Sequence, residues 1–426
     1  MSRTALATAA RREPGWFGQP KGLTILFLTQ MWEQFSYYGM RALLVYYMTR
    51  GLLLGQEKAS LVYGAYTATA YLTPIFGVLI ADRGLGRRRA VITGATIMAA
   101  GHFMMSSDAL LYVALATIAL GNGLFLPSLP SQIATLYEAS DPRRARAYNV
   151  YYVGVNLGGF LAPLICGTLG EVYGWHVGFA AAGVGMLIGL LVYVLGGSYL
   201  QGAEREPSAA APATPSDGHK GVMTFVLLLG IGVAVTVFRG AYEQIGNTVA
   251  LWSDAGITRQ IVTLVIPATW FQSLNPLLVF VMTPALLGYW RRRADEGLEP
   301  LATRRMALGA LIVAFSYLLL AGVAAATAAE RANGLWLVLY FVIFTFGELH
   351  ILPTGLGLFA RLAPERLAAT TVATWFLATF SGSLFAGLIG TLWSSMSHAI
   401  FFGFLALVAA VAAAMLLALG PLEVRS

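Results

Sequence analysis

The chain has 426 residues, of which 58% are hydrophobic and only 11% are charged, and its formal net charge is +7. A typical soluble domain carries about 25% charged residues, and a single globular core stops growing beyond roughly 250–300 residues. The composition therefore excludes a water-soluble protein. The single cysteine, Cys166, excludes a disulfide framework and a cysteine-based metal site.

Apolar stretches recur along the whole chain at the length of about 20 residues that a helix needs to cross the roughly 30 Å hydrocarbon core of a bilayer. They predict an all-α membrane protein with twelve transmembrane helices. The predicted spans are 23–49, 59–80, 90–107, 109–137, 145–169, 176–199, 221–252, 259–290, 304–326, 334–360, 368–392 and 397–420. An even number of spans places both termini on the same side of the membrane.

The distribution of the 27 Lys and Arg residues indicates which side that is. Counted from the N-terminus, alternate loops hold 21 of them, whereas the opposite loops hold only Arg50, Lys58, Arg259 and Arg331. The positive-inside rule therefore predicts that both termini are cytoplasmic. We expect a multi-pass protein of the bacterial inner membrane. The basic net charge reflects this topology and does not indicate a nucleic-acid partner.

A stretch rich in Pro, Ala and Ser, residues 201–220, lacks apolar periodicity and is typical of a flexible linker. It separates a cytoplasmic N-terminus (1–22) and a first six-helix bundle (23–200) from a second six-helix bundle (221–420) and a cytoplasmic tail (421–426). Two pseudo-symmetric bundles of this kind bind their substrate near the midplane, between the halves.

Charged residues inside predicted spans are the first functional indication, because each costs about 2.5–3.5 kcal/mol on insertion scales and usually faces the bundle interior. There are five: Glu33, Arg41, Arg239, Glu243 and Glu348. On the first span, the polar residues from Gln30 to Arg41 recur at helical spacing and share one face. Arg239 and Glu243, four residues apart, can instead neutralise each other. Helix-to-helix pairing and function both stay open for each residue.

The loop between the second and third spans reads GVLIADRGLGRRRAVITG. Asp82 and Arg83 can pair across the helix ends, the glycines permit a tight turn, and Arg87 with its neighbours keeps the loop in the cytoplasm. We interpret this loop as a cytoplasmic gate. The sequence shows no nucleophile–base pair, metal-ligand cluster or phosphate-binding loop, which argues against an enzyme and against a cofactor.

That loop resembles the signature loop of the major facilitator superfamily. The chain as a whole resembles one branch of it, the proton-coupled oligopeptide transporters, or POT family. The resemblance rests on ordered stretches such as TQMWEQFSYYGMRALLVYYM, GNGLFLPSLPSQIATLYEASDPRRARAYNVYYVGVNLGG, YEQIGNTVALW, WFQSLNPLLVFVMTPALLGYW and FGELHILPTGLGLFARLAPER. It implies the twelve-helix major facilitator fold. Where bacterial members often insert two helices between the halves, this chain has only a linker.

The resemblance also implies roles for individual residues. In relatives, the glutamate that matches Glu348 takes the amino terminus of a peptide, and the residues that match Arg41 and Glu243 meet at the outer gate. Glu33 matches a residue of the proton-coupling network. The remaining matched positions are assigned to the substrate-binding cavity: Tyr38, Tyr71, Asn156, Asn275 and Trp375.

The departures from the family pattern concern charge. The family's first-span motif Glu-x-x-Glu-Arg is here Gln30-Met31-Trp32-Glu33-Gln34, and the fourth-span Lys falls on Leu126. Arg239 stands where relatives often carry a Trp. In relatives, the missing Lys and Arg help to hold the carboxylate of a peptide. We therefore expect that this anchor has moved or vanished and that proton coupling is weakened or rerouted.

These observations predict an alternating-access secondary transporter for di- and tripeptides or peptide-like small molecules. The five buried charges sum to −1, which favours a zwitterionic or cationic substrate. An alternative is a facilitator or exporter of the same fold that carries a non-peptide, amphipathic or antibiotic-like molecule. A membrane enzyme or a transport-inactive sensor has little support. Protons and membrane lipid are the other partners that the sequence suggests.

Overall fold

The computed structural model describes residues 15–138, 141–200, 218–261, 264–327, 330–362 and 368–425. Contacts divide the chain into two compact units. The first comprises Met1–Tyr47 and Thr69–Ser208, and the second comprises Met48–Ala68 and Ala209–Ser426. The expected linker, 201–220, lies outside the described residues except for its last three positions, which already belong to a helix.

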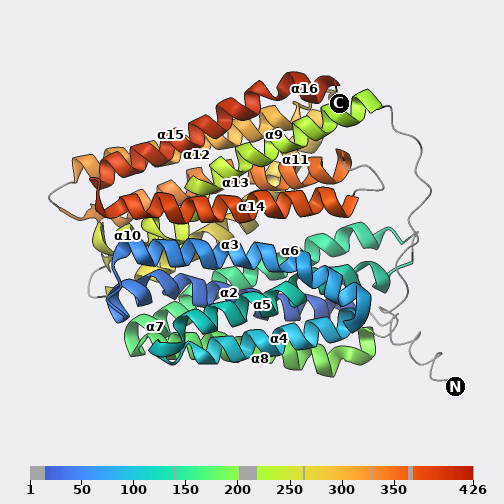
Figure 1. Cartoon of the computed structure of the whole chain (residues 1–426), viewed down its shortest axis with the longest axis horizontal. Helices are drawn as coiled ribbons and strands as arrows, with labels where there is room; N and C mark the ends of the chain where they lie inside the picture. Colours follow the sequence, from blue (N-terminus) through green and yellow to red (C-terminus); the bar gives the residue numbers. More distant parts are fainter. Residues whose placement is uncertain are drawn as a thin grey trace. The chain divides into compact units, whose positions relative to one another are not determined.

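The first unit is a bundle of long helices in which α2 packs against α6 and α8, and α4 packs against α5 and α8 (Figure 1). α3 begins in the second unit and enters the first at Thr69. The helices are α2 (Lys21–Tyr46), α3 (Gln56–Ile80), α4 (Arg87–Met104), α5 (Leu111–Ser128), α6 (Arg143–Ala162), α7 (Thr168–Tyr173) and α8 (Trp175–Leu195).

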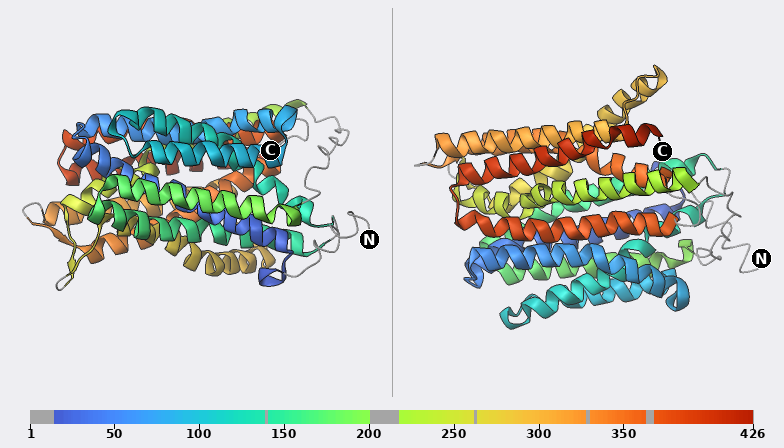
Figure 2. Two further views of the ribbon diagram at one scale, coloured as in Figure 1. Left: turned by 90° about the horizontal axis from the view of Figure 1, so that it is seen from below. Right: turned by 45° about the horizontal axis from the view of Figure 1, so that its top comes forward.

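The second unit is also a helical bundle, in which α9, α12, α14 and α15 run alongside one another (Figures 1 and 2). α13 packs against α12 and carries α11 on another side. The helices are α9 (Gly218–Tyr242), α10 (Thr248–Ala255), α11 (Leu274–Asp295), α12 (Ala302–Ala326), α13 (Gly334–Leu362), α14 (Ala368–Thr391), α15 (His398–Ala418) and α16 (Gly420–Arg425). The expected C-terminal tail is therefore largely helical.

Short 3₁₀ and π turns extend or interrupt many of these helices. The π turns are η2 (Tyr47–Gly51), η3 (Ala81–Leu85) and η7 (Pro163–Gly167). The 3₁₀ turns are η1 (Trp16–Gly18), η4 (Asp108–Leu110), η5 (Pro130–Gln132), η6 (Ala134–Leu136), η8 (Gly196–Leu200), η9 (Glu243–Gly246), η10 (Ala268–Ser273) and η12 (Leu392–Ser394). Pro163 begins η7. Because proline has no backbone N–H, it cannot donate the i→i−4 hydrogen bond that would continue α6 regularly.

The expected span 259–290 is wrong at its start. The chain there forms short strands, with β2 (Gln260–Ile261) antiparallel to β3 (Leu264–Val265). β1 (Ile257–Thr258) pairs in parallel with β4 (Ala332–Asn333), which precedes α13. The apolar composition of this stretch is compatible with either structure. A short apolar stretch does not by itself distinguish a strand from a helix, so the pairing of β2 with β3 is not visible in the hydropathy of the span.

Within the described residues, ten helical segments are long and apolar enough to cross a membrane. They correspond to ten of the twelve expected spans, and together they make the predicted all-α membrane architecture. α2 and α4 stand at the other two expected positions. α2 carries several polar residues along its length, and α4 begins with three consecutive arginines, so both are less apolar than the rest.

Close helix contacts in the first unit depend on glycine. A Cβ atom placed on Gly77 of α3 would lie 1.8 Å from the carbonyl oxygen of Gly123 in α5. Nearby, the Thr73 hydroxyl donates to the carbonyl of Ala119 at 2.7 Å, and the Asn122 amide donates to the carbonyl of Ala70 at 2.9 Å. Small residues that let backbones approach, with polar side chains bonded across, are a common way to pack helices in lipid.

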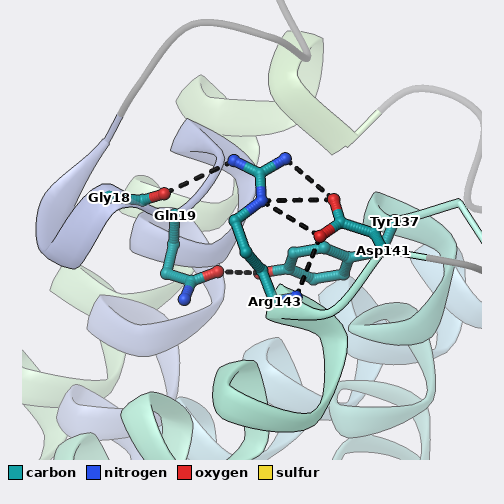
Figure 3. Close-up of polar contacts among 5 residues, drawn as sticks. All are labelled: Gly18, Gln19, Tyr137, Asp141 and Arg143. Atoms are coloured by element: carbon teal, nitrogen blue, oxygen red, sulfur yellow. Dashed lines mark hydrogen bonds and ion pairs between the residues drawn. The ribbon is translucent and has the colours of Figure 1, made fainter.

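The segment before α2 is tied to the start of α6 by a polar cluster (Figure 3). Tyr137 donates to Gln19 Oε1 at 2.8 Å, and Arg143 Nη2 pairs with Asp141 Oδ2 at 2.8 Å. Arg143 Nη1 also donates to the carbonyl of Gly18 at 3.4 Å. The Arg143 guanidinium holds the pKa of the Asp141 carboxyl below its usual range. This cluster lies at the end of the unit where the sequence predicts cytoplasm.

At the end of the second unit that the sequence also assigns to the cytoplasm, α16 caps the start of α12. The Glu423 carboxylate of α16 accepts from the backbone N–H groups of Ala302 and Thr303 at 2.8 and 2.9 Å, and from the Thr303 hydroxyl at 2.7 Å. These are the first residues of α12, whose amides lack partners within the helix. A carboxylate at this position is also stabilised by the helix dipole.

We expect Gly77→Ala to destabilise the protein by about 1–3 kcal/mol, since the added methyl group must push α3 and α5 apart. The control is Gly403→Ala in α15, because a Cβ there meets nothing within 4 Å. Thermal unfolding of the purified protein in detergent measures both. A Gly77→Ala variant as stable as the Gly403→Ala control would contradict the packing described here.

Candidate functional site

The buried charged side chains form two polar clusters, one in each unit. In the first unit, Glu33 of α2 is almost fully buried, and its Oε2 accepts hydrogen bonds from the side-chain amides of Gln30 and Gln34, both at 2.7 Å. Tyr151 of α6 donates its hydroxyl hydrogen bond to Gln30 Oε1. Tyr151, Gln30 and Glu33 thus form a chain that joins α6 to α2.

The partners of Glu33 are neutral groups. Among the described residues, its recorded hydrogen bonds come only from the two glutamine amides, and no ion pair is found for it. A hydrogen bond to a charged group is stronger than one between neutral groups, yet an amide cannot exchange a proton with a carboxylate. The cluster therefore holds Glu33 in place without offering it a titratable neighbour on α2.

The other expected residues of the first unit lie on several helices. Arg41 has its guanidinium carbon 5.9 Å from the centre of the Tyr38 ring on the same helix. Asn156 of α6 is buried and donates to the carbonyl of Tyr152 at 2.9 Å. Tyr71 of α3 and Leu126 of α5 are half-buried. Leu126 is an apolar side chain, so this position contributes no charge to the unit.

The expected gate loop is the π turn η3 and the start of α4. Asp82 and Arg83 are both exposed, and Gly86 has the positive φ of 76° that lets the chain turn into α4. Arg87 Nη1 donates to the carbonyl of Ser131 at 3.4 Å, which links α4 to the turns that follow α5. The gating role of these residues stays a prediction.

In the second unit, Arg239 and Glu243 form an ion pair at the end of α9. Their side chains are 5% and 1% exposed, and they are four residues apart. The Arg239 guanidinium also lies 5.2 Å from the centre of the Tyr242 ring. The alternative that these two charges neutralise each other is therefore confirmed. Arg41 belongs to the first unit and Glu243 to the second, so the gate contact expected between them stays a prediction.

Glu348 of α13 is the second buried carboxylate of this unit, and it receives donors from two other helices. Tyr242 of α9 donates to its Oε1 at 2.8 Å, and Asn275 of α11 donates to its Oε2 at 2.6 Å. The Asn275 amide also donates to the hydroxyl of Thr345 at 3.0 Å. The Glu348 cluster thus joins α9, α11 and α13 through one carboxylate, and both of its donors are neutral.

Sequence reasoning missed three residues of these clusters, Tyr151, Tyr242 and Thr345. Tyr242 lies between Arg239 and Glu243 in the chain, and its ring contacts the Arg239 guanidinium while its hydroxyl contacts Glu348. It therefore connects the ion pair with the neighbouring carboxylate. A tyrosine beside a buried charge in a span is a usable signal, because the hydroxyl is one of the few polar groups that an apolar helix can offer.

Trp375 of α14, expected in the substrate cavity, is buried in the apolar core of the second unit. Its ring packs edge-to-face on Phe359 of α13 with the centroids 5.3 Å apart. A Cβ on Gly355 would lie 2.4 Å from this indole. In this structure Trp375 packs α14 against α13, and its role in binding stays a prediction.

The start of α3, which belongs to the second unit, is bonded to α10 and α14. The Ser60 hydroxyl donates to Asn247 Oδ1 at 3.0 Å, and the Gln56 amide donates to the carbonyl of Gly390 at 2.8 Å. Just before α3, Arg50 pairs with Asp254 at the end of α10, and Arg259 pairs with the same carboxylate at 2.8 Å. This carboxylate between two arginines lies at the end of the unit predicted to face outward.

The model of the POT family matches residues 88–215 and 216–406. The chain is 31% identical to the uncharacterized transporter YclF of Bacillus subtilis, over 97% of this chain and 96% of that protein. It is 30% identical to a di-/tripeptide transporter of Lactococcus lactis subsp. cremoris, over 96% of each. The crystal structure of a peptide transporter POT in complex with sulfate superposes with a TM-score of 0.88 at 28% identity, over 99% of each chain.

We expect Arg239→Gln to destabilise the second unit by about 3–5 kcal/mol, because it leaves the buried Glu243 carboxylate without its ionic partner. The double variant Arg239→Gln/Glu243→Gln should recover most of that loss, since the carboxylate that lost the Arg239 guanidinium is then removed as well. Thermal unfolding in detergent compares the two. A double variant that is less stable than the single one would show that the charges are not a mutually compensating pair.

Proposed function

This chain belongs to the POT family, and we propose that it is an alternating-access secondary transporter that carries di- and tripeptides or peptide-like small molecules across the bacterial inner membrane. The membrane-spanning helices and the bacterial peptide transporters among its relatives support this function. The positive-inside distribution of Lys and Arg supports cytoplasmic termini.

The Glu348 cluster is the observation that carries the proposal. Glu348 is a buried carboxylate whose two hydrogen-bond donors, the Tyr242 hydroxyl and the Asn275 amide, are neutral, and the nearby Arg239 guanidinium, which is paired with Glu243, acts on it only through space. A buried charge in a span is favourable only if it is paired, and a protonated α-amine is a suitable partner. Asn275 and Tyr242 would then hold the carboxylate in a fixed orientation while the amine binds.

The charge balance of the second unit supports the same substrate class. Arg239 is occupied by Glu243, so the three charged residues at the site sum to −1 and favour the cationic end of a substrate. The positions where relatives carry cations for the substrate carboxylate, Gln34 and Leu126, are neutral here. We infer that the amine of the substrate contributes more to binding than its carboxylate does.

The same neutral positions favour a second candidate. A site that holds a cation firmly and a carboxylate weakly also suits a non-peptide, amphipathic or antibiotic-like amine. Transport of such a molecule by a facilitator or exporter of this fold would need no change in the Glu348 cluster. Peptides with an amidated C-terminus distinguish the two candidate functions. They retain the amine that Glu348 would bind and lose only the carboxylate, for which Gln34 and Leu126 offer no cation.

We further propose that proton coupling is weakened or rerouted. A proton relay needs groups whose charged forms are stabilised differently in different states of the transporter. Gln30 and Gln34 do not titrate, and these are the groups that hold Glu33. Glu33 then acts as a hydrogen-bonding residue, which leaves Glu243 and Glu348 as the carboxylates available for coupling.

We expect Glu348→Gln to weaken binding of free-amine dipeptides by roughly 10- to 100-fold, the equivalent of losing one hydrogen bond to a charged group. Binding of the N-acetylated forms, already weak, should change little. Competition for uptake in liposomes measures both series. The control is Glu57→Gln, which changes an exposed glutamate of α3. Equal losses for free and N-acetylated peptides would contradict the assignment of Glu348 to the amine.

We also expect uptake into liposomes to depend only weakly on an inward proton gradient, and Glu33→Gln to leave the remaining transport largely intact. The reason is that an amide at position 33 preserves the hydrogen-bonding role and removes a charge that has no titratable partner on α2. Uptake with and without an imposed gradient, at several pH values, measures this. Accumulation that requires the gradient and is abolished by Glu33→Gln would show that the relay runs through Glu33.

A further inference from the structure

The cytoplasmic end of α11 and the start of α12 bring an indole and a guanidinium group together, and a second arginine follows the indole by one helical turn. The guanidinium of Arg305 in α12 stacks on the ring of Trp290 in α11, with its central carbon 4.3 Å from the ring centre. Arg293 lies three residues after Trp290, on the neighbouring part of the same helix surface. We call these three residues the α11–α12 donor cluster; α11 is the gold helix at the edge of the second unit in Figure 2.

One buried nitrogen of each of these three side chains has no acceptor. Trp290 is only 9% exposed, and its indole Nε1 is buried without a hydrogen-bond partner. The Nε atoms of Arg293 and Arg305 are also buried without one. Indole and guanidinium groups donate and do not accept, so the three cannot satisfy one another. Because buried polar groups are nearly always hydrogen-bonded, the cluster lacks a group rich in acceptor oxygens.

The local charge indicates that this group is an anion. The segment 291–305 holds five arginines against three acidic residues, Asp295, Glu296 and Glu299. The three acids are exposed, and of these Glu299 alone interacts electrostatically with Arg305, without forming an ion pair in the part of the chain that the structure describes. The surplus of positive charge therefore stays uncompensated at the place where the buried donors lie.

The dipoles of α11 and α12 do not explain why arginines gather at both helix ends. Cations near the end of α11 are stabilised by the carboxyl-terminal end of its dipole, but Arg304 and Arg305 lie in the first turn of α12, where a cation is unfavourable. The amides of that turn are not the binding groups either, because Glu423 already accepts from those of Ala302 and Thr303. The side chains of the cluster remain as the donors that need an acceptor.

The surroundings indicate that the anion has an apolar part. The cluster lies where two membrane-spanning helices meet the predicted cytoplasmic surface, at which anionic lipids attract basic side chains. Along α11 and in the following loop, large apolar side chains are exposed: Phe280, Val281, Leu287, Tyr289 and Leu298. These can contact an acyl chain whose headgroup is at the cluster.

We propose that Trp290, Arg293 and Arg305 bind the phosphate of an anionic phospholipid from the cytoplasmic leaflet. The indole is already positioned for this task. His350 of α13 lies edge-on to it with the ring centres 5.6 Å apart, and the His350 imidazole is itself fixed by a 2.7 Å hydrogen bond between Nδ1 and the carbonyl of Phe346. The lipid would thereby join α11 to α12 at the end of α11 opposite to Asn275, the residue that bonds Glu348.

The test is native mass spectrometry of the full-length protein, titrated with phosphatidylglycerol or phosphatidylcholine. The wild type should retain one phosphatidylglycerol more tightly than phosphatidylcholine. Arg305→Gln should weaken phosphatidylglycerol binding by about fivefold, the effect of one basic residue at a lipid surface. Trp290→Phe, which keeps the ring and loses the N–H, should weaken it by roughly tenfold, the effect of one hydrogen bond to a charged group. The matched control is Arg304→Gln, which removes the same charge from the exposed neighbouring side chain.

Three results would overturn the proposal. The first is an Arg304→Gln variant that loses as much affinity as Arg305→Gln, which would indicate attraction by the loop charge as a whole. The second is equal retention of the two lipids by the wild type. The third is displacement of phosphatidylglycerol by millimolar glycerol phosphate, which would assign the cluster to a soluble anion. Gel filtration of each variant before titration excludes unfolded protein, and the result does not depend on which substrate is transported.

Discussion

The structure depends on how charged side chains within the membrane-spanning helices find partners, because the surrounding lipid does not solvate them. A charge inside a span persists only when it has a partner or a task. Three solutions occur here: the ion pair of Arg239 and Glu243 within one helix, the amides that bond Glu33, and the neutral donors from two helices that hold Glu348. The first is an ion pair, whereas Glu33 and Glu348 receive hydrogen bonds from neutral donors; of these two carboxylates, Glu348 is the one to which we assign the amine of the substrate.

The Glu348 cluster also explains how binding can affect helix arrangement. Its members come from α9, α11 and α13, and Tyr242 contacts both the Arg239 guanidinium and the Glu348 carboxylate. An amine that binds Glu348 therefore acts on three helices at one point. α11 contributes Asn275 near its start and the α11–α12 donor cluster near its end, and α13 is the main helix that it packs against. A ligand at either end would restrict the same helix.

The first unit differs from the family pattern in charge rather than in shape. Leu126 and Gln34 fit helices of the expected length and position, and Gln34 continues to bond Glu33. What is lost is the ability of neighbouring groups to exchange protons or to hold a carboxylate. An amide replaces an arginine as a hydrogen-bond donor to Glu33 but not as a charge, so binding and coupling can change while the fold does not.

The sequence alone determined the membrane class, the positions of most helices and the residues with buried charge, because these follow from hydropathy, helical periodicity and the cost of a charge in lipid. It identified Glu33, Glu243 and Glu348, but not which donors each would receive. The partner of Glu243 was left open between alternatives, and Tyr151, Tyr242 and the short strands near residue 260 were missed. Tertiary structure decided these points, because the hydrogen bonds of Tyr151 and Tyr242 join residues 121 and 106 positions apart, whereas sequence periodicity reports only which face of its own helix a residue occupies.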